Sequence, residues 1–406
     1  MRYLVALFVF LLVAPSPHAQ TWEAGPELNT ARRRAAVAVL DGQLYVIGGR
    51  NAAGYPMGSV ERLGDGGWGP VASLRDARYG AAAVAFDGRI VLIGGHDDNE
   101  VTEDVEAYVP EENDWESFQS LDQAREGLGA AVLGGRIYAL GGATQSGALL
   151  ASCEYYDTAD DNWYPFPAWT LDPQRAAFGA VAADEVAYVA GGFSDFGPLD
   201  TAERYTLSTG TEPLPPMPTA RGGLALATDG AALYAIGGLN ADDEVLSVVE
   251  RFDLQSGAWE TIAPLNTARS GAVAAYVDGA IYVAGGRDAL GNLLTSVEVL
   301  PLTPVAGEEE AAPVAVTLEA AYPNPFAGHT TFTLTLDEPA ALSLRIYDVR
   351  GREVAVLLDG PVGAGTRQVI WDGRAADGRG LASGVYIARL AGASGTVTQR
   401  LTLLRR

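Results

Sequence analysis

The sequence predicts an all-β protein in which six similar four-stranded units are followed by a small β-sandwich. The first observation is the run LYVIGGR, residues 44–50, which returns in related form five more times. The second glycines of successive copies lie 46, 47, 50, 46 and 48 residues apart, a fixed period that marks a repeat architecture. The second observation is charge: residues 20–302 carry 16 Arg against 40 acids, whereas residues 318–406 carry 10 Arg against 8 acids. We therefore expect two modules.

The first 20 residues predict a secretory signal peptide. They contain one Arg, an apolar run from Tyr3 to Ala14, and then Pro, Ser and small residues. This run is shorter than a membrane span requires, and no other stretch of the sequence qualifies. We expect an exported protein without a transmembrane span.

One repeat, residues 31–78, shows what each unit should form. Asp41-Gly42 is a two-residue hairpin turn of the kind that favours positive φ at both positions. The four expected strands are AAVAVL (35–40), QLYVIGG (43–49), SVERL (59–63) and GWGPVASL (67–74). Four short strands joined by turns and repeated around an axis describe one blade of a β-propeller.

Three kinds of residue recur in every unit. The paired glycines are expected to be structural, because they let backbones approach closely and let the strand bend into the next loop. They cannot form a phosphate-binding loop of the GxxxxGK[ST] type, since the chain has no Lys. A Glu in each third strand and an Arg before each first strand are expected to pair within the blade. The Glu residues are 61, 106, 154, 203, 250 and 298, and the Arg residues are 32, 78, 125, 175, 221 and 269.

The tryptophans indicate how the ring closes. Four fourth strands carry a Trp (68, 115, 163 and 259), a further one has Thr211 at that place, and the last unit lacks a fourth strand. The segment TWEAGPELNTAR after residue 20 matches AWETIAPLNTAR at 258–269. Residues 21–28 should therefore supply the missing outer strand, which closes the ring without a free sheet edge.

Residues 21–302 resemble the Kelch family in the paired glycines, the spaced Glu, the Trp that follows it and the Arg after Pro-Leu. The resemblance implies a six-bladed Kelch β-propeller closed by an N-terminal outer strand. This chain departs from the family pattern where Thr211 replaces Trp and in the longer third unit, which contains NWYPFPAW.

Residues 303–317, rich in Pro, Ala and Glu, predict a linker, and residues 318–406 predict a small β-sandwich. TTFTLTL (330–336) and LSLRIYDV (342–349) alternate like strands with one buried face. The module resembles the type A C-terminal sorting domain of bacterial type IX secretion, itself similar to the immunoglobulin-like domain of flagellar hook-capping proteins. The residues that carry the likeness are YPNPF (322–326), IYDVRGREV (346–354), WDGRAADGRGLASGVYIARL (371–390) and the terminal strand.

That resemblance implies that residues 318–406 engage the type IX secretion machinery. Delivery to the outer-membrane cell surface, or release from the cell, would follow. The alternative is a fixed accessory β-domain. Because the propeller region is acidic, bulk charge excludes nucleic acid as a partner. A monomer is expected.

The sequence offers few groups for chemistry. Beyond residue 20 the only His residues are His96 and His329, and no HExxH, Ser-His-Asp or Cys/His metal set is present. The single Cys153 excludes an internal disulfide, and we favour a buried, inert thiol over a reactive one. We expect no metal, no cofactor and no catalytic residue, and favour solvated loops over Ca²⁺ sites at 97–100 and 241–244.

A ligand is expected at the end of the ring formed by the loops after the glycine pairs and before the first strands. Positions that differ from blade to blade there should decide the ligand. The residues that stand out are Arg33, Arg50, Tyr79, His96, Glu126 and Arg287. Three cations on an acidic protein suit a carboxylate-bearing sugar or an acidic peptide.

Three functional hypotheses follow. The favoured one is a non-catalytic binding module for a glycan or protein partner, exported to the cell surface or secreted. The alternative, implied by secreted Kelch propellers, is a sugar-acid epimerase or mutarotase with Glu126 and His96 as acid–base residues. The third is a passive envelope scaffold, in which charge changes at these loops alter no binding.

Overall fold

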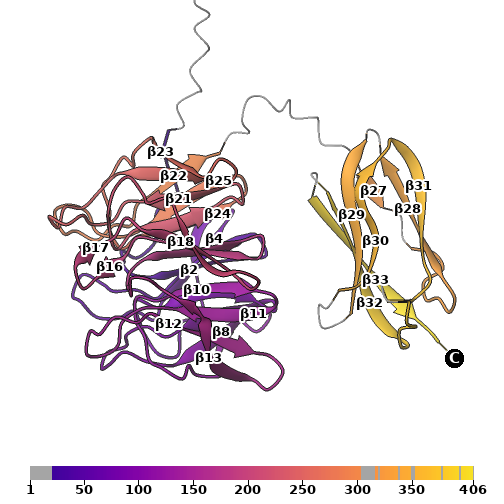
Figure 1. The fold of residues 1–406 in the computed structure, drawn as a ribbon, viewed down its shortest axis with the longest axis horizontal. Coiled ribbons are helices and arrows are strands. Elements are labelled where there is room, and N and C mark those ends of the chain that lie inside the picture. The colour runs from indigo at the N-terminus through magenta and orange to yellow at the C-terminus, as the bar shows by residue number, and fades with distance from the viewer. Residues whose placement is uncertain are drawn as a thin grey trace, which may run out of the picture. The chain divides into compact units, whose positions relative to one another are not determined.

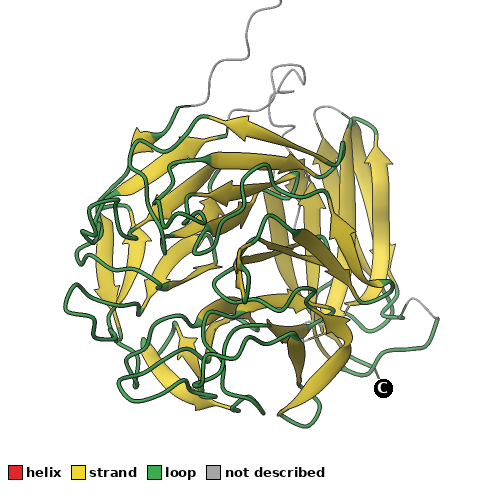
Figure 2. Ribbon diagram, turned by 60° about the vertical axis from the view of Figure 1, so that its left-hand side comes forward, coloured by secondary structure: helices red, strands yellow, loops and turns green. Residues whose placement is uncertain are grey.

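The computed structural model describes residues 21–302, 316–318, 321–336, 339–348, 353–375, 378–392 and 395–405. It divides the chain into two compact units, Met1–Thr303 and Pro304–Arg406. Within the described residues every regular element is a β-strand (Figures 1 and 2). Residues 1–20, the predicted signal peptide, and 303–315 of the predicted linker lie outside the described residues. No helix in the described ranges is long and apolar enough to span a membrane.

The first unit contains six antiparallel four-stranded sheets, which confirms the predicted blades. Blade 1 contains β2 (Ala36–Leu40), β3 (Gln43–Ile47), β4 (Val60–Gly64) and β5 (Gly67–Val71). Blade 2 contains β6 (Ala82–Phe86), β7 (Arg89–Ile93), β8 (Val105–Val109) and β9 (Asp114–Phe118). Blade 3 contains β10 (Gly129–Leu133), β11 (Arg136–Leu140), β12 (Ser152–Asp157) and β13 (Asn162–Thr170). Blade 4 contains β14 (Gly179–Ala183), β15 (Val186–Ala190), β18 (Ala202–Thr206) and β19 (Gly210–Leu214). Blade 5 contains β20 (Ala225–Thr228), β21 (Ala232–Ile236), β22 (Val249–Asp253) and β23 (Ala258–Ile262). Blade 6 contains β24 (Val273–Val277), β25 (Ala280–Ala284), β26 (Val297–Pro301) and β1 (Glu23–Ala24).

The blades stand around a common axis (Figure 2), and the first strand of each is the innermost, since these strands line the central cavity. Each inner strand packs against the inner strand of the next blade, and β24 packs against β2 to complete the circle. The N-terminal strand β1 pairs with β26, with Glu23 opposite Val299 and Ala24 opposite Glu298. The predicted closure of blade 6 by an N-terminal outer strand is therefore confirmed.

Hydrophobic cores lie between neighbouring blades, and a Trp crosses each outer boundary. Blade 1 packs Tyr45 and Ile47 against Tyr108 and Trp115 of blade 2 in one buried cluster. Trp115 also donates its indole N–H to the carbonyl of Ala72 at 2.9 Å. The corresponding bonds at four other boundaries run from Trp22 to Ala263, Trp68 to Pro26, Trp163 to Gln119 and Trp259 to Pro215.

Blade 4, which has Thr211 where the other blades have Trp, obtains its indole from blade 3. The nine-residue strand β13 carries Trp169, which donates its N–H to the carbonyl of Thr206 at 3.0 Å and packs against Tyr205. Trp169 is 1% exposed. The extra length of the third unit thus supplies the Trp that the fourth unit lacks.

The second unit is a β-sandwich, as predicted. One sheet contains β27 (Val316–Leu318), β28 (Thr330–Leu336) and β31 (Gly365–Trp371); the other contains β30 (Glu353–Val362), β29 (Ala340–Asp348), β32 (Gly384–Gly392) and β33 (Gly395–Leu403). Phe332, Leu344 and Trp371 are among the side chains buried between the sheets. β27 begins at Val316, inside the stretch 303–317 expected to be a linker.

Candidate functional site

Each repeated Arg forms a buried ion pair with the repeated Glu of its own blade. In blade 1, Nη2 of Arg32 donates to Oε1 of Glu61 at 2.6 Å, and the two side chains are 1% and 3% exposed. Nη1 of Arg32 also donates to the carbonyls of Gly48 and Ser59. The other pairs are Arg78–Glu106, Arg125–Glu154, Arg175–Glu203, Arg221–Glu250 and Arg269–Glu298. The predicted pairing is confirmed, and these charges cannot contact a ligand.

The glycine pairs join each blade to the next. Gly48 has φ +60°, and a Cβ on it would lie 2.5 Å from the backbone carbonyl oxygen of Arg78 in blade 2. The N–H of Gly49 donates to that same oxygen at 2.9 Å. The repeated Arg therefore connects blades through its backbone while its guanidinium holds its own blade. The predicted close backbone approach is confirmed at this place.

A closed ring of backbone hydrogen bonds surrounds the axis where the inner strands begin. The residue two positions after each repeated Arg donates its N–H to the carbonyl of the equivalent residue in the preceding blade, at 2.7–2.8 Å. The six residues of this ring, called the floor below, are Arg34, Gly80, Gly127, Ala177, Gly223 and Gly271. All six have positive φ. The floor narrows the central opening of the ring at this end of the propeller.

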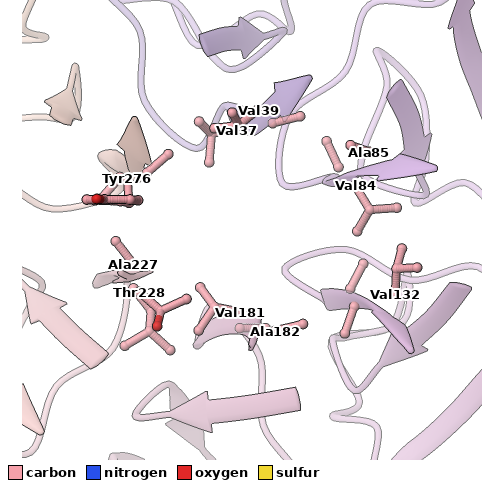
Figure 3. Close-up of a pocket in the computed structure, with 18 residues that line it drawn as sticks. Val37, Val39, Val84, Ala85, Val132, Val181, Ala182, Ala227, Thr228 and Tyr276 are labelled. Carbon is pink, nitrogen blue, oxygen red and sulfur yellow. The ribbon is translucent and has the colours of Figure 1, made fainter. Parts of the chain in front are cut away.

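Beyond the floor, the inner strands line a central cavity of about 400 Å³, and most of the residues that line it are Ala and Val. The residues that line it include Val37, Val39, Val132, Ala182 and Tyr276 (Figure 3). No charged side chain lines the cavity. The charged candidates identified from sequence therefore lie elsewhere.

The six predicted site residues lie around the floor. The residue after each repeated Arg forms an antiparallel bridge with the residue after each glycine pair. The bridges that contain predicted site residues are Arg33–Arg50, Tyr79–His96, Glu126–Ala143 and Ser270–Arg287. Blades 6, 1, 2 and 3 thus bring all six residues to one end of the propeller, which we call the floor face.

Four guanidinium groups gather on the floor face and form what we call the arginine cluster, Arg33, Arg34, Arg50 and Arg287. Partial burial lowers the pKa of Arg33, and the positive charges of Arg287, Arg50 and Arg34 lower that pKa further. Arg50 donates to the carbonyl of Gly54 at 2.6 Å, and Arg287 donates to the hydroxyl of Ser270 at 3.3 Å. Within the described residues, neither of these two nor Arg33 forms an ion pair with a carboxylate.

Tyr79 provides an aromatic surface for the cluster. Its ring stacks on that of His96 with the centroids 5.0 Å apart and the planes at 11°. The guanidinium carbons of Arg34 and Arg50 lie 4.8 Å and 5.0 Å from the Tyr79 centroid, within cation–π range. Nδ1 of His96 is 2.7 Å from the carbonyl oxygen of Asp97. The stacking fixes both rings in place.

Glu126 is the one predicted acidic residue, and it is already paired. Its carboxylate accepts a hydrogen bond at 2.7 Å from Arg34, whose side chain is 31% exposed. A Cβ on Gly80 would lie 2.9 Å from Nη2 of Arg34, so the Arg34 side chain passes over the floor of blade 2 to reach blade 3. Sequence reasoning missed Arg34. Its signal was present, because four of the six equivalent positions are Gly.

Metal and thiol chemistry have little support in the described part of the chain. No group of three or more His, Cys, Asp or Glu residues there could hold a metal ion. Oδ1 of Asp97 accepts the backbone N–H groups of Asn99 and Glu100, so this acidic loop uses its own oxygens. Cys153 is 2% exposed, and burial raises its pKa to about 12. That no metal or cofactor is bound remains a prediction.

The fold and the arrangement of repeats define a six-bladed β-propeller with a C-terminal immunoglobulin-like domain. The Kelch motif matches residues 31–63, 77–121, 124–168, 220–266 and 268–300, half of the chain, so the protein belongs to the Kelch-repeat family. The unmatched stretch between 168 and 220 contains blade 4, which lacks a Trp of its own. The FlgD Ig-like domain matches residues 322–396.

A solved structure with the same fold is that described as "Structure of YjhT". The two chains are 16% identical with a TM-score of 0.60, and the match covers 67% of this chain and 95% of that one. At this identity the likeness shows the fold alone. No curated protein sequence matches this chain.

Proposed function

We propose that this Kelch propeller is a non-catalytic binding module that holds a carboxylate-bearing glycan or protein partner on its floor face. One observation carries the proposal: Arg33, Arg50 and Arg287 have no carboxylate partner among the described residues. Elsewhere in the propeller the repeated arginines are all paired with Glu. A set of unpaired guanidinium groups is a recognition surface for carboxylates, which they can bind through two parallel hydrogen bonds.

The electrostatics of the cluster support an anionic ligand. Partial burial and, after it, the neighbouring positive charges lower the pKa of Arg33, and a bound anion would offset that repulsion between the guanidinium groups. The chain as a whole carries a net charge of −24, so the cluster is a local exception. Such contrast gives specificity for where an anion can dock.

The enzymatic alternative, a sugar-acid epimerase or mutarotase, uses the same surface. It needs Glu126 and His96 to transfer protons. The Glu126 carboxylate is bound by Arg34, and the His96 ring is stacked on Tyr79, with Nδ1 at a backbone carbonyl. These contacts favour binding over proton transfer. NMR of sialic acid or aldose anomers with and without protein tests the alternative: faster anomer exchange that Glu126→Gln abolishes would replace the binding proposal.

The proposal includes export and delivery by the C-terminal domain. The resemblance of residues 318–406 to type IX sorting domains and the FlgD Ig-like match at 322–396 support it. In a bacterium with a type IX system, deletion of residues 318–406 should retain the propeller in the periplasm. If the truncated protein reached the surface or medium as efficiently as the full chain, the domain would be an accessory module.

The binding proposal is tested by a thermal-shift screen against neutral sugars, sugar acids and acidic peptides. A ligand present at 100 times its dissociation constant should add roughly 2.7 kcal/mol of stability. Arg50→Ala and Arg287→Ala should each remove the shift. Arg89→Ala is the matched control, because Arg89 begins β7 at the opposite end of blade 2 and pairs with Glu116. If no ligand produces a shift, the passive scaffold becomes the better hypothesis.

A further inference from the structure

The central cavity opens at the end of the propeller opposite the floor face. Each inner strand runs from the floor to a hairpin turn that leads into the second strand of its blade. The cavity lies along these strands, and its volume of about 400 Å³ is in the range of small-molecule sites. We call the six hairpin turns around its mouth the turn ring.

The wall of the cavity carries hydrogen-bonding groups of the backbone. Each inner strand is the terminal strand of its sheet, so one of its edges is free. In an antiparallel pair, every second residue turns its N–H and C=O away from the partner strand. In blade 1 these residues are Val37 and Val39, since the hairpin turn makes Leu40 and Gln43 a hydrogen-bonded pair. Both line the cavity, as do the equivalent residues of the other five blades.

These backbone groups decide which ligands the cavity can take. A buried N–H or C=O that gives up water without gaining a partner costs about 1–3 kcal/mol. An apolar ligand would leave many such groups unpaired, so the ligand must carry donors and acceptors of its own. The side chains leave room for it, because most are Ala or Val and those of Ala85 and Ala182 are exposed.

The turn ring is acidic. It contains six acids and no Arg, and the acids are Asp41, Asp87, Asp184, Glu185, Asp229 and Asp278. All but Glu185 and Asp229 follow a cavity-lining residue by two positions and are exposed. These four carboxylates form no hydrogen bond or ion pair with the described residues. The mouth of the cavity therefore has four unpaired negative charges.

The neighbouring charges do not neutralise this ring. Arg89 and Arg136 follow two of the turns, but they pair with Glu116 and Asp157 of their own blades. A cleft with uncharged walls and one sign of charge at its mouth concentrates counter-ions. Tyr276, two residues before Asp278, is the one aromatic residue that lines the cavity. An aromatic ring near carboxylates suits an ammonium group.

We propose that the central cavity binds a small polyhydroxylated amine in its protonated form, of which an amino sugar is the simplest example. The ammonium group lies at the turn ring, and the hydroxyl groups exchange hydrogen bonds with the free backbone edges of the inner strands. The ligand is opposite in charge to the one proposed for the floor face. This second site lies at the other end of the propeller and does not rest on the proposed function.

Calorimetric titration of the full-length protein at neutral pH tests this inference with four compounds. Glucosamine has both required features, N-acetylglucosamine and glucose lack the charge, and hexylamine lacks the hydroxyl groups. Glucosamine should bind about tenfold more tightly than each of the other three, a difference of roughly 1.4 kcal/mol. About 1 M salt should weaken its binding, because the Debye length falls to about 3 Å.

Protein variants locate the site. Asp41→Asn combined with Asp278→Asn should remove the advantage of glucosamine over N-acetylglucosamine, and Asn tolerates the positive φ of both positions. Asp65→Asn is the matched control, because Asp65 lies at the same end of blade 1 but in the outer turn between β4 and β5. Ala182→Leu should fill the cavity and abolish glucosamine binding, with the melting temperature as the check on folding.

Two results would overturn the inference. One is glucosamine binding that is no tighter than that of every comparison compound, which includes no binding at all. The other is an equal effect of the Asp65 and the Asp41/Asp278 substitutions, which would place the amine on the acidic surface in general. Neither result bears on the floor face, whose carboxylate ligands are tested separately with Arg50→Ala and Arg287→Ala.

Discussion

Arg32 and Arg33 are adjacent in the sequence but have opposite environments. Arg32 is 1% exposed, paired with Glu61 and bonded to two carbonyls, and every blade has its equivalent. Arg33 is half-buried among three other guanidinium groups, has no carboxylate partner in the described structure, and occurs in only one blade. In this ring, the Arg that every blade repeats is paired with a Glu of its own blade, whereas its unrepeated neighbour Arg33 has no carboxylate partner among the described residues and is, in our proposal, available to a ligand.

The largest expected effect follows from breaking the repeated member of the pair. Arg32→Ala leaves Glu61 buried without its partner, which should lower the free energy of unfolding by about 3–5 kcal/mol. Arg33→Ala should change it by less than about 0.5 kcal/mol, because a surface charge is lost and repulsion is relieved. Chemical denaturation of both variants measures the difference. Equal destabilisation would show that the two arginines do not differ in role.

Trp169 extends the comparison. Its position in the sequence is not repeated, but it makes the hydrogen bond across a blade boundary that a Trp makes at every other boundary. Trp169→Ala should cost about 3–5 kcal/mol through the cavity it leaves and the lost bond to Thr206. The matched control is Phe196→Ala, in the next blade and fully exposed, with no measurable change in melting expected. If Trp169→Ala left the free energy of unfolding unchanged, blade 4 would not depend on an indole at its boundary with blade 3.

The Glu126→Gln variant tests how tightly the arginine cluster binds a ligand once the carboxylate paired with Arg34 is removed. Glu126→Gln frees Arg34 and removes a negative charge, so a carboxylate ligand should bind about fivefold more tightly, on the order of 1 kcal/mol for a partly exposed pair. Glu116→Gln, which alters the exposed pair with Arg89, is the control. Calorimetric titration measures the change. Weaker binding to Glu126→Gln would place Glu126 in direct contact with the ligand.

Cys153 gives the smallest expected effect. It is an unrepeated residue too, but it is buried, so being unrepeated does not by itself make a residue available to a ligand or reagent. Burial raises its pKa to about 12, so at about pH 8 it remains a neutral thiol, whereas an ordinary cysteine is partly ionised. A thiol reagent should label it only after denaturation. Rapid labelling of the native protein would show that blades 3 and 4 open locally.

Much of the fold could be predicted from the sequence because the repeat shows each element six times. The glycine pairs, the Arg–Glu pairs and the match between residues 21–28 and 258–269 together indicated the blades and the closing strand. Blade 4 was harder, because Thr211 and NWYPFPAW are separate anomalies in the sequence. Only the packing of Trp169 against Tyr205 shows that one compensates for the other.

The candidate site was predicted in part. Repetition identified the loop positions, and Arg33, Arg50, Tyr79 and His96 do lie together. Arg34 was missed because it is one residue further along than the positions compared, although the Gly at four of its equivalent positions marks it as an exception. Glu126 was expected to be available, and its pairing with Arg34 spans two blade boundaries, a contact that no local pattern encodes.

The difference between repeated and unrepeated arginines can be measured in one experiment, by reacting the native protein with phenylglyoxal and mapping the modified sites by mass spectrometry. The reagent attacks uncharged guanidinium groups, so the lowered pKa and partial exposure of Arg33 should make it react early. The buried arginines, Arg32 among them, should be unmodified, and a bound carboxylate ligand should protect Arg33, Arg50 and Arg287 together. Equal modification of Arg32 and Arg33, or no protection by any ligand that binds, would contradict the assignment of the arginine cluster as the binding site.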